Sequence, residues 1–394
     1  MKNKNDLIFS AVIFCSVLFP SSAYAENHHI AGLIVSPTLI LHQTFDSNIL
    51  SSNDNEKSSF ISVISPALNI SKRENAIRSS VLYDLEYAKY LNSQSDEYLD
   101  QQLVANISLQ FSAQSLLRAQ MKYLFLHDDR GTGFTHGSGD SIDQPDKYNI
   151  RKIGLMYRYG SVRSTGRLEF EMSGLAQRYS NRDEIVYLGN RNYIDSRIAF
   201  YYQIRPKTSL LFELENSDID YRIEANGNNL DNNEKRLFVG SEWDITAITT
   251  GFLKIGVIKK TFESEEREEF MGTGWRFGAV WKPLTYSTVN IQTSGKTNET
   301  IGTSDYIESK IFLVGWEHQW HKQWATEIRA KFTKNNFKPT DHHEEIWSLS
   351  LLFTYKMRRW LSFDTGVSNV DRSSSQTGLD FKRNLIFLKL TIDL

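Results

Sequence analysis

The side chains of this sequence that could perform chemistry are few, and the clearest group is His136-Gly137-Ser138. A histidine two positions before a serine is the spacing of some membrane-bound lipid hydrolases, in which the imidazole activates the serine hydroxyl as a nucleophile. Those enzymes carry the pair on a strand beside the lipid, whereas here it lies among glycines in a polar stretch. We therefore predict that the protein is not an enzyme.

Two further stretches contain atoms that metal ions bind. Asp341-His342-His343-Glu344-Glu345 offers imidazole and carboxylate groups to a divalent cation, and Glu263 to Glu269 offers carboxylates to calcium or to cations that bridge lipopolysaccharide. Neighbouring residues of one loop seldom converge on one ion without a third element. Solvated loops explain both stretches, and also His28 and His29, so we expect no metal site and no cofactor.

The elements that position these residues follow one repeated pattern. Segments in which every second residue is apolar or aromatic alternate with polar connections from residue 32 to residue 394. A strand that crosses a bilayer needs about 9 to 11 residues, shows lipid one face and water the other, and must be paired on both edges. The pattern predicts an all-β fold, an up-and-down antiparallel transmembrane β-barrel of about 18 strands in the bacterial outer membrane.

The connections alternate between short and long. Tight turns are predicted at 205–208, 282–285 and 356–359, whereas long polar loops are predicted at 46–58 and 128–147. Short turns at one rim and long loops at the other are typical of outer-membrane barrels, whose short turns face the periplasm. An even number of strands would place both termini in the periplasm.

The first 25 residues have the pattern of a cleaved secretory signal peptide, with an apolar core from Leu7 to Phe19 and the cleavage site Ala23-Tyr24-Ala25. Residues 26–394 then form a single barrel domain. Cys15, the only cysteine of the sequence, lies in this leader. We therefore expect a mature chain without thiols or disulfides.

Alternation within the strands assigns side chains to the two faces of the wall. Asp84 and Glu86 alternate with Val81, Tyr83 and other apolar residues, and a carboxylate facing lipid at mid-bilayer depth is costly. Charged and amide side chains are therefore predicted to face the lumen. The candidate pore-lining residues are Asp84, Glu86, Arg118, Gln120, Lys122, Glu169, Glu171, Arg197, Gln203, Glu213, Glu215, Arg276, Glu327, Arg329, Lys331 and Lys389.

The predicted lining carries both signs of charge in similar number. A strongly ion-selective pore needs a ring of one sign, so a mixed lining favours neutral or weakly charged cargo such as sugars. Paired internal charges also make barrels rigid, which leaves a purely structural interpretation of the same residues open. The formal net charge of −2 gives no reason to expect a nucleic-acid partner.

The loop at 128–147 has two interpretations that the sequence does not separate. It is rich in glycine and polar residues and could fold inward to constrict the pore. It could equally be a mobile surface loop.

The chain ends within an alternating segment in which Ile386, Leu388, Leu390 and Ile392 share one face. This ending resembles the carboxy-terminal signal that the barrel-assembly machinery reads, although Leu394 stands where an aromatic residue is usual. We expect that machinery and the outer-membrane lipid to be partners of the chain.

The opening of the predicted barrel is its most distinctive part. Pro37 lies in the first segment, Phe45-Asp46 and Asn48 follow it, and Pro66 lies in the second segment. This order resembles the opening of the outer-membrane β-barrel porins that accompany capsule and exopolysaccharide gene clusters. The resemblance implies a conduit for secreted polysaccharide that works with a periplasmic export protein. Physically, Asp46 and Asn48 could cap a turn through side-chain to backbone hydrogen bonds.

The sequence thus predicts a channel in the outer membrane of a Gram-negative bacterium that secretes capsular or exopolysaccharide. Two alternatives remain open at this point. One is a general or oligosaccharide-uptake porin, which would share the fold and the lining. The other is a surface receptor or adhesion barrel whose lumen is plugged.

Overall fold

The computed structural model describes residues 28–30, 32–162, 164–181, 189–222, 229–246, 248–300 and 304–394. The predicted signal peptide, residues 1–25, lies outside the described residues. Besides strands, the described chain contains two short 3-10 helices, η2 (Gln94–Asp96) and η3 (Gly133–Thr135). In these ranges no helix is long and apolar enough to cross a membrane.

The strands follow one another along the chain without a second domain between them. They are β1 (His28–Ile30), β2 (Leu33–Asp46), β3 (Ser59–Glu74), β4 (Ile77–Tyr90), β5 (Tyr98–Gln110), β6 (Ser115–Asp128), β7 (Asp146–Tyr159), β8 (Gly166–Tyr179), β9 (Arg191–Arg205), β10 (Thr208–Tyr221), β11 (Asn232–Thr246), β12 (Thr249–Phe262), β13 (Phe270–Leu284), β14 (Ser287–Asn298), β15 (Tyr306–His321), β16 (Trp324–Lys338), β17 (His343–Arg358), β18 (Leu361–Ser374) and β19 (Phe381–Asp393).

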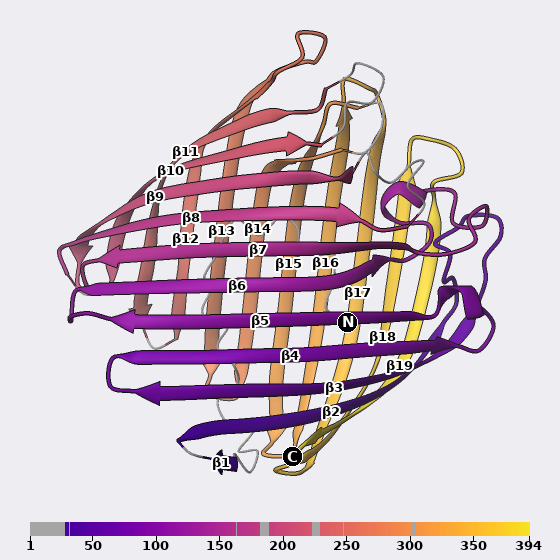
Figure 1. The fold of residues 1–394 in the computed structure, drawn as a ribbon, viewed down its shortest axis with the longest axis horizontal. Coiled ribbons are helices and arrows are strands. Elements are labelled where there is room, and N and C mark those ends of the chain that lie inside the picture. The colour runs from indigo at the N-terminus through magenta and orange to yellow at the C-terminus, as the bar shows by residue number, and fades with distance from the viewer. Residues whose placement is uncertain are drawn as a thin grey trace.

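Strands β2 to β19 form a closed barrel of 18 strands. Each strand pairs antiparallel with the next one along the chain, and β19 pairs back with β2, from Leu385 opposite Asp46 to Asp393 opposite Thr38. Figure 1 shows β3 to β9 running across the front of the molecule while β14 to β19 cross behind them at a steep angle. The short β1 pairs only with the start of β2. The predicted up-and-down barrel of about 18 strands is confirmed.

The two rims differ in the way that the sequence predicts. Figure 1 shows the β3–β4, β5–β6 and β7–β8 turns together at one rim, whereas η2 and η3 lie at the other. Asn75 takes the left-handed backbone conformation, with φ of 47°, in the two-residue connection between β3 and β4. Asparagine tolerates this conformation better than most residues because its short amide bonds locally.

Two of the predicted turns lie a few residues later in the structure. Pro283 falls inside β13, which runs to Leu284, and β17 continues to Arg358. In both strands the pairing register shifts just before the turn, between Trp281 and Leu284 and between Lys356 and Arg358. Such a bulge leaves a residue unpaired, and proline, which has no N–H to donate, is tolerated there.

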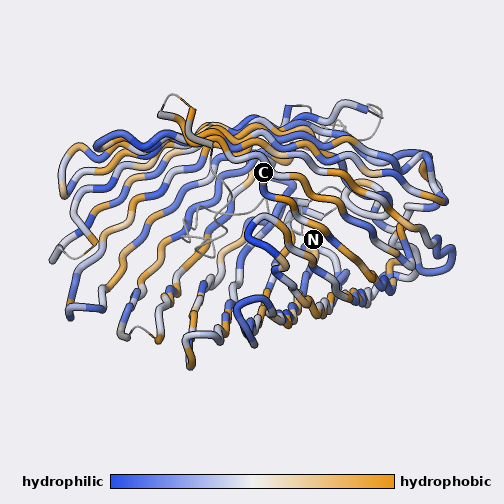
Figure 2. Tube along the Cα trace, turned by 90° about the horizontal axis from the view of Figure 1, so that it is seen from below, coloured by the Kyte–Doolittle hydropathy of each residue, from blue (hydrophilic) through white to orange (hydrophobic). Residues whose placement is uncertain are grey.

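The two faces of the wall differ sharply in character. On β10, Phe212 and Leu214 are 47% and 49% exposed, whereas Glu213 between them is 1% exposed. Figure 2 shows the same alternation as blue and orange segments along the strands. Because a water-soluble surface seldom exposes so many large apolar side chains, the outer face is the one that suits lipid.

The face assignment predicts unequal effects of the same substitution at neighbouring positions of β17. Leu349 is exposed on the outer face, and Ser350 points to the inner face. We expect Leu349→Arg to lower the free energy of unfolding in a bilayer by about 2–4 kcal/mol, because it places a cation in hydrocarbon. Ser350→Arg should change it far less. Urea titration of folding into lipid vesicles, followed by tryptophan fluorescence, measures both, and equal effects would contradict the assignment.

Candidate functional site

The lumen side of the wall is identified by ion pairs between strands that are not neighbours. Arg276 on β13 donates two hydrogen bonds to Glu215 on β10, at 2.6 and 2.7 Å. Arg167 on β8 donates to Glu242 on β11 at 2.7 Å. Side chains from strands three apart meet only on the concave side of a curved sheet. Glu215 and Arg276 therefore face the lumen, and their role as the lining of a conducting pore stays a prediction.

Arg197 on β9 is the centre of one charged cluster on this face. Its guanidinium donates to Glu213 at 2.7 Å, to Glu171 at 2.7 Å and to Glu169 at 3.4 Å. It also donates to the Tyr201 hydroxyl at 2.8 Å. Three carboxylates from two flanking strands thus share one cation, so four of the predicted lining residues lie in direct contact.

A second cluster continues from Glu213 across the next strands. Lys254 on β12 donates to Glu213, and Arg236 on β11 donates to Glu215 at 3.1 Å and to Glu234. Both Glu213 and Glu215 are buried. A buried carboxylate is costly unless it is paired, and each of these two has more than one basic partner.

The charges of β11 and β12 were missed in the sequence analysis. Lys260 lies fully buried and donates to Glu234 at 3.4 Å and to Glu299, while Thr297 donates to Glu234. Alternation with the apolar residues of β11 would have placed Glu234 and Arg236 on the same face as each other. The position of Glu299 has no such signal, because this residue lies in the connection that follows β14.

The predicted acids of β4 are satisfied by polar side chains of the next strand. Asp84 accepts a hydrogen bond from the Gln102 amide at 2.7 Å, and Glu86 accepts one from the Tyr98 hydroxyl at 2.6 Å. Both donors belong to β5 and share the inner face with the acids. The predicted face of these residues therefore agrees with their contacts.

Strands β6 and β16 carry predicted lining residues that lie outside the two charged clusters described above. On β6, Gln120 donates to the amide oxygen of Asn106 at 2.8 Å. Arg118 and Lys122 lie two positions to either side of Gln120 and are partly exposed. Lys331 is likewise partly exposed in β16.

The remaining predicted residues form local contacts. Arg329 donates to Glu327 within β16, and Lys389 of β19 lies 2.7 Å from Asp364 of β18. Gln203 lies near the end of β9, where its amide donates at 3.0 Å to a main-chain carbonyl of the following turn. Gln203 therefore stabilises the turn between β9 and β10, and it lies outside the charged clusters of the wall.

The residues of the distinctive opening have structural contacts. Asp46 accepts a hydrogen bond from the Asn48 N–H at 2.9 Å, and the Asn48 amide donates to the carbonyls of Ser52 and Lys382 at 2.7 and 3.0 Å. These bonds form the turn cap that the sequence suggests. Asp46 also accepts two hydrogen bonds from Arg383 of β19, at 2.8 and 2.5 Å. The motif thus joins the first long strand of the barrel to the last.

The other motif residues lie in or beside the same strands. Pro37 and Pro66 are paired within β2 and β3. The Pro37 carbonyl accepts a hydrogen bond from the N–H of Leu394 at 2.9 Å, and the ring of Phe45 lies 5.1 Å from that of Phe60. These contacts explain the motif by packing and pairing.

Residues 129–145, between β6 and β7, form a segment that we call the lumen loop. Arg130 at its base donates two hydrogen bonds to Asp96, at 2.6 and 2.5 Å, and His136 near its tip lies 3.2 Å from Glu344 of β17. Around the closed barrel, β17 stands seven strands from β6, through β2 and β19. The loop therefore folds inward at the long-loop rim, as one of its two interpretations required.

His136, the histidine of the His-x-Ser spacing, lies in a partly buried group of ionisable side chains. Its Nε2 lies 3.2 Å from Oε1 of Glu344, and Nε2 of His342 lies 3.3 Å from the same oxygen. Burial, together with the positive charges of Arg372 and His342, lowers the pKa of His136 to about 3. An imidazole with so low a pKa is a weak general base for Ser138.

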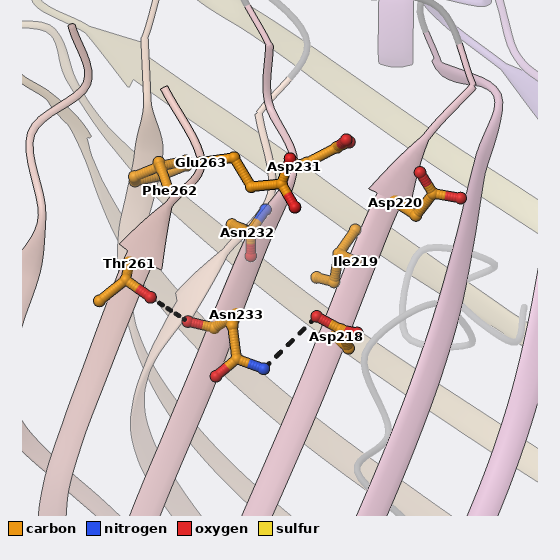
Figure 3. Close-up of a pocket in the computed structure, with 9 residues that line it drawn as sticks. All are labelled: Asp218, Ile219, Asp220, Asp231, Asn232, Asn233, Thr261, Phe262 and Glu263. Carbon is orange, nitrogen blue, oxygen red and sulfur yellow. Dashed lines mark hydrogen bonds between the residues drawn. The ribbon is translucent and has the colours of Figure 1, made fainter. Parts of the chain in front are cut away.

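The acidic stretches do not assemble into a metal centre in the part of the chain that the structure describes. There, no group of three or more His, Cys, Asp or Glu side chains is arranged to hold an ion. Figure 3 shows a pocket with acidic lining residues, where Asp218 faces Asn233 and Asp231 lies near Glu263. In the second stretch, Arg267 donates at 2.6 Å to Asp305, a carboxylate that lies outside the stretch.

Comparison with solved structures identifies the same architecture in known outer-membrane proteins. OpdO of Pseudomonas aeruginosa is 11% identical, with a TM-score of 0.50 over 93% of this chain and 100% of that one. OccK1 (OpdK) of P. aeruginosa is 9% identical, with a TM-score of 0.51 over 91% and 99%. At these identities the likeness concerns the fold alone.

A third structure, the FrpB iron transporter of Neisseria meningitidis (F5-1 variant, apoprotein form), is 10% identical with a TM-score of 0.53 over 86% of this chain. The chain spans 62% of the length of that transporter. None of the curated proteins matches the sequence significantly. Residues 29–394 match the family described as "Putative beta-barrel porin 2". The chain belongs to this family of outer-membrane β-barrel porins.

Proposed function

We propose that the protein is a water-filled channel of the outer membrane that carries a capsular or extracellular polysaccharide outward. The observation that supports this cargo is the local compensation of charge on the inner face. Arg197 is shared by three glutamates, and Glu215 is shared by Arg276 and Arg236. Compensated charges give a weak net field, so hydroxyl groups can exchange hydrogen bonds along the wall without one strong trap.

The direction of transport and the partners rest on the resemblance of the opening strands to the porins of polysaccharide gene clusters. In this proposal a periplasmic export protein delivers the polymer to the short-turn rim, and both termini face the periplasm. The barrel-assembly machinery inserts the chain, and outer-membrane lipid surrounds its apolar face.

A second candidate, a porin for the uptake of oligosaccharides or other small solutes, is favoured by the lumen loop. The loop occupies part of the long-loop mouth and is held there by the hydrogen bonds from Arg130 to Asp96 and by the close packing of Gly137 against Leu379. A fixed segment in the mouth limits the width of a passing solute, which suits short molecules better than a thick polymer. If the same loop closed the mouth completely, the protein would be a plugged surface receptor or adhesion barrel, which is the third candidate.

Deletion of the gene separates export from uptake. We expect the deletion to abolish or sharply reduce polysaccharide at the cell surface, because the polymer then lacks the proposed channel across the outer membrane. Quantification of surface polysaccharide and uptake of labelled oligosaccharides are the two measurements, with the gene restored on a plasmid as the control. Unchanged polysaccharide together with lost uptake would reject export and favour the second candidate.

Substitution of the paired glutamates should change ion selectivity in a predictable direction. We expect Glu213→Gln with Glu215→Gln to make the channel more anion-selective, because Lys254, Arg197 and Arg276 keep their charges. Arg276→Gln should shift selectivity toward cations. Reversal potentials across planar bilayers under a salt gradient measure both shifts.

The control for the selectivity measurement is Glu265→Gln, which removes an exposed carboxylate from the connection between β12 and β13. It should leave the reversal potential close to that of the native protein. Opposite shifts for the two lumen variants support a lining role for these residues. If neither variant moves the reversal potential, ions do not pass the charged wall.

Replacement of residues 131–141 by a short Gly-Ser linker tests the lumen loop. We expect the conductance of single channels in planar bilayers to rise, because the loop then leaves the mouth. A short linker of the same kind in the connection between β12 and β13, in place of the largely exposed stretch 264–266, is the control. A protein that carries almost no current in either form would instead be the plugged receptor.

A further inference from the structure

We infer that Arg383, held by Asp46, is the positioning residue that fixes the lumen loop and with it the size limit of the channel. The inference deepens the proposed channel function and depends on it for the statement about size. It assigns a task to the Asp46 motif beyond the capping of a turn. Its evidence is a chain of contacts that begins where β19 pairs with β2, which we call the seam of the barrel, and ends in the lumen loop.

The first link is the pair between Asp46 and Arg383. Asp46 is fully buried and accepts hydrogen bonds from both Nε and Nη2 of Arg383, so the guanidinium plane is fixed. Two donors of one guanidinium that converge on a single oxygen, Oδ2 of Asp46, restrain the orientation of the side chain as well as its distance. The remaining nitrogen of Arg383, Nη1, points to Oδ2 of Asp129, the first residue of the lumen loop, at 3.7 Å.

The second link fixes the base of the loop from the other side. Oδ1 of Asp129 lies 3.1 Å from Nε2 of His127, and Nδ1 of His127 lies 2.8 Å from Asp100. The Tyr98 ring stacks on the His127 ring at 3.8 Å. Asp129 therefore stands between Arg383 of β19 and the β5–β6 side of the wall, and its position depends on both.

The third link is the close packing of the loop that follows this base. A Cβ on Gly131 would lie 1.8 Å from the Leu50 carbonyl oxygen, and one on Gly139 would lie 2.3 Å from the same atom. Gly137, with φ of +75°, lies against Leu379, where a Cβ would come within 2.0 Å of the Leu379 side chain. Glycine at these positions lets the loop lie directly on the β2–β3 and β18–β19 connections, so a shift at Asp129 is not absorbed by loose packing.

The position of Leu50 connects the same packing to the motif. Leu50 is buried two residues after Asn48, whose amide and main-chain bonds hold the turn in place. Asp46 thus supports the lumen loop in two ways, through Arg383 and through the turn on which the loop rests. The geometry explains why one carboxylate serves both the seam and the mouth.

The test uses a neutral pair that leaves no buried charge without a partner. In Asp46→Asn with Arg383→Gln, both charges of the seam are removed together, and the amide oxygen introduced by Asp46→Asn can still accept the hydrogen bond from the Asn48 N–H. The matched control is Asp364→Asn with Lys389→Gln, which removes an ion pair between β18 and β19 away from the lumen loop. Both double variants remove one pair from the same wall.

The first readout does not require conduction. Arg130 is buried, so trypsin should cleave the native protein in detergent slowly after this residue. We expect cleavage to be about tenfold faster in the seam variant, because local opening of the loop costs less free energy. The control variant should be cleaved at the native rate. Equal rates in all three proteins would overturn the inference.

The second readout is the size limit. Conductance in the presence of polyethylene glycols of increasing mass gives the mass at which the polymer stops entering the channel. We expect this mass to rise in the seam variant, Asp46→Asn with Arg383→Gln, and to stay native in the control. The single variant Arg383→Lys keeps the positive charge beside Asp46, so its limit should lie between those of the native protein and the seam variant. An unchanged limit in the seam variant contradicts the inference.

A third variant tests the loop contact in a protein whose Asp46–Arg383 pair is unchanged, in case the seam variant does not fold. Asp129→Asn removes the charge on the loop, at a position that is partly exposed, and leaves the Asp46–Arg383 pair intact. It should also speed cleavage after Arg130. A protein that conducts no ions in any form would refute the proposed channel, whereas native cleavage of Asp129→Asn and of the seam variant would refute the positioning role alone.

Discussion

Backbone hydrogen bonding in a medium without water is the constraint on which the structure depends. Each N–H and C=O group that enters hydrocarbon must find a partner within the protein. Strands β2 to β19 meet this demand by pairing in sequence, and the β19–β2 pairing removes the last open edge. Once the sheet is closed, every strand has one face toward lipid and one toward the lumen, which produces the alternation of apolar and polar residues.

Much of this architecture could be predicted because it depends on local pattern. A period of two over 12 to 16 residues identifies each strand, and a switch from a short to a long connection identifies the rims. The turns after Pro283 and Met357 were placed early because bulges extend β13 and β17, and a bulge leaves no signal in hydropathy.

The contacts within the lumen were harder to predict because they join residues far apart in sequence. Alternation places Glu215 and Arg276 on the same face, but only the curvature of the wall brings β10 and β13 within 2.6 Å at their side chains. Glu299 and the lumen loop follow no periodic pattern at all. Their positions depend on packing against distant strands, and the sequence of the loop itself gives no signal of which strands these are.

The two sides of the barrel have different tasks. Strands β8 to β13 carry the shared ion pairs around Arg197 and Glu215, which link strands up to three positions apart on the inner face. The opposite side, from β17 through β19 to β5, supports the lumen loop at its mouth. In the proposed channel, one side sets the charge that a solute meets, and the other sets the space that remains for it.

The seam pair has a consequence for biogenesis. Asp46 and Arg383 are separated by 337 positions, so neither residue meets its counterpart until nearly the whole polypeptide has been delivered to the membrane. Contacts of such long range form late, because they require the greatest ordering of the intervening chain. Completion of the mouth is thereby coupled to completion of the cylinder, and an unfinished barrel would have an unstructured entrance.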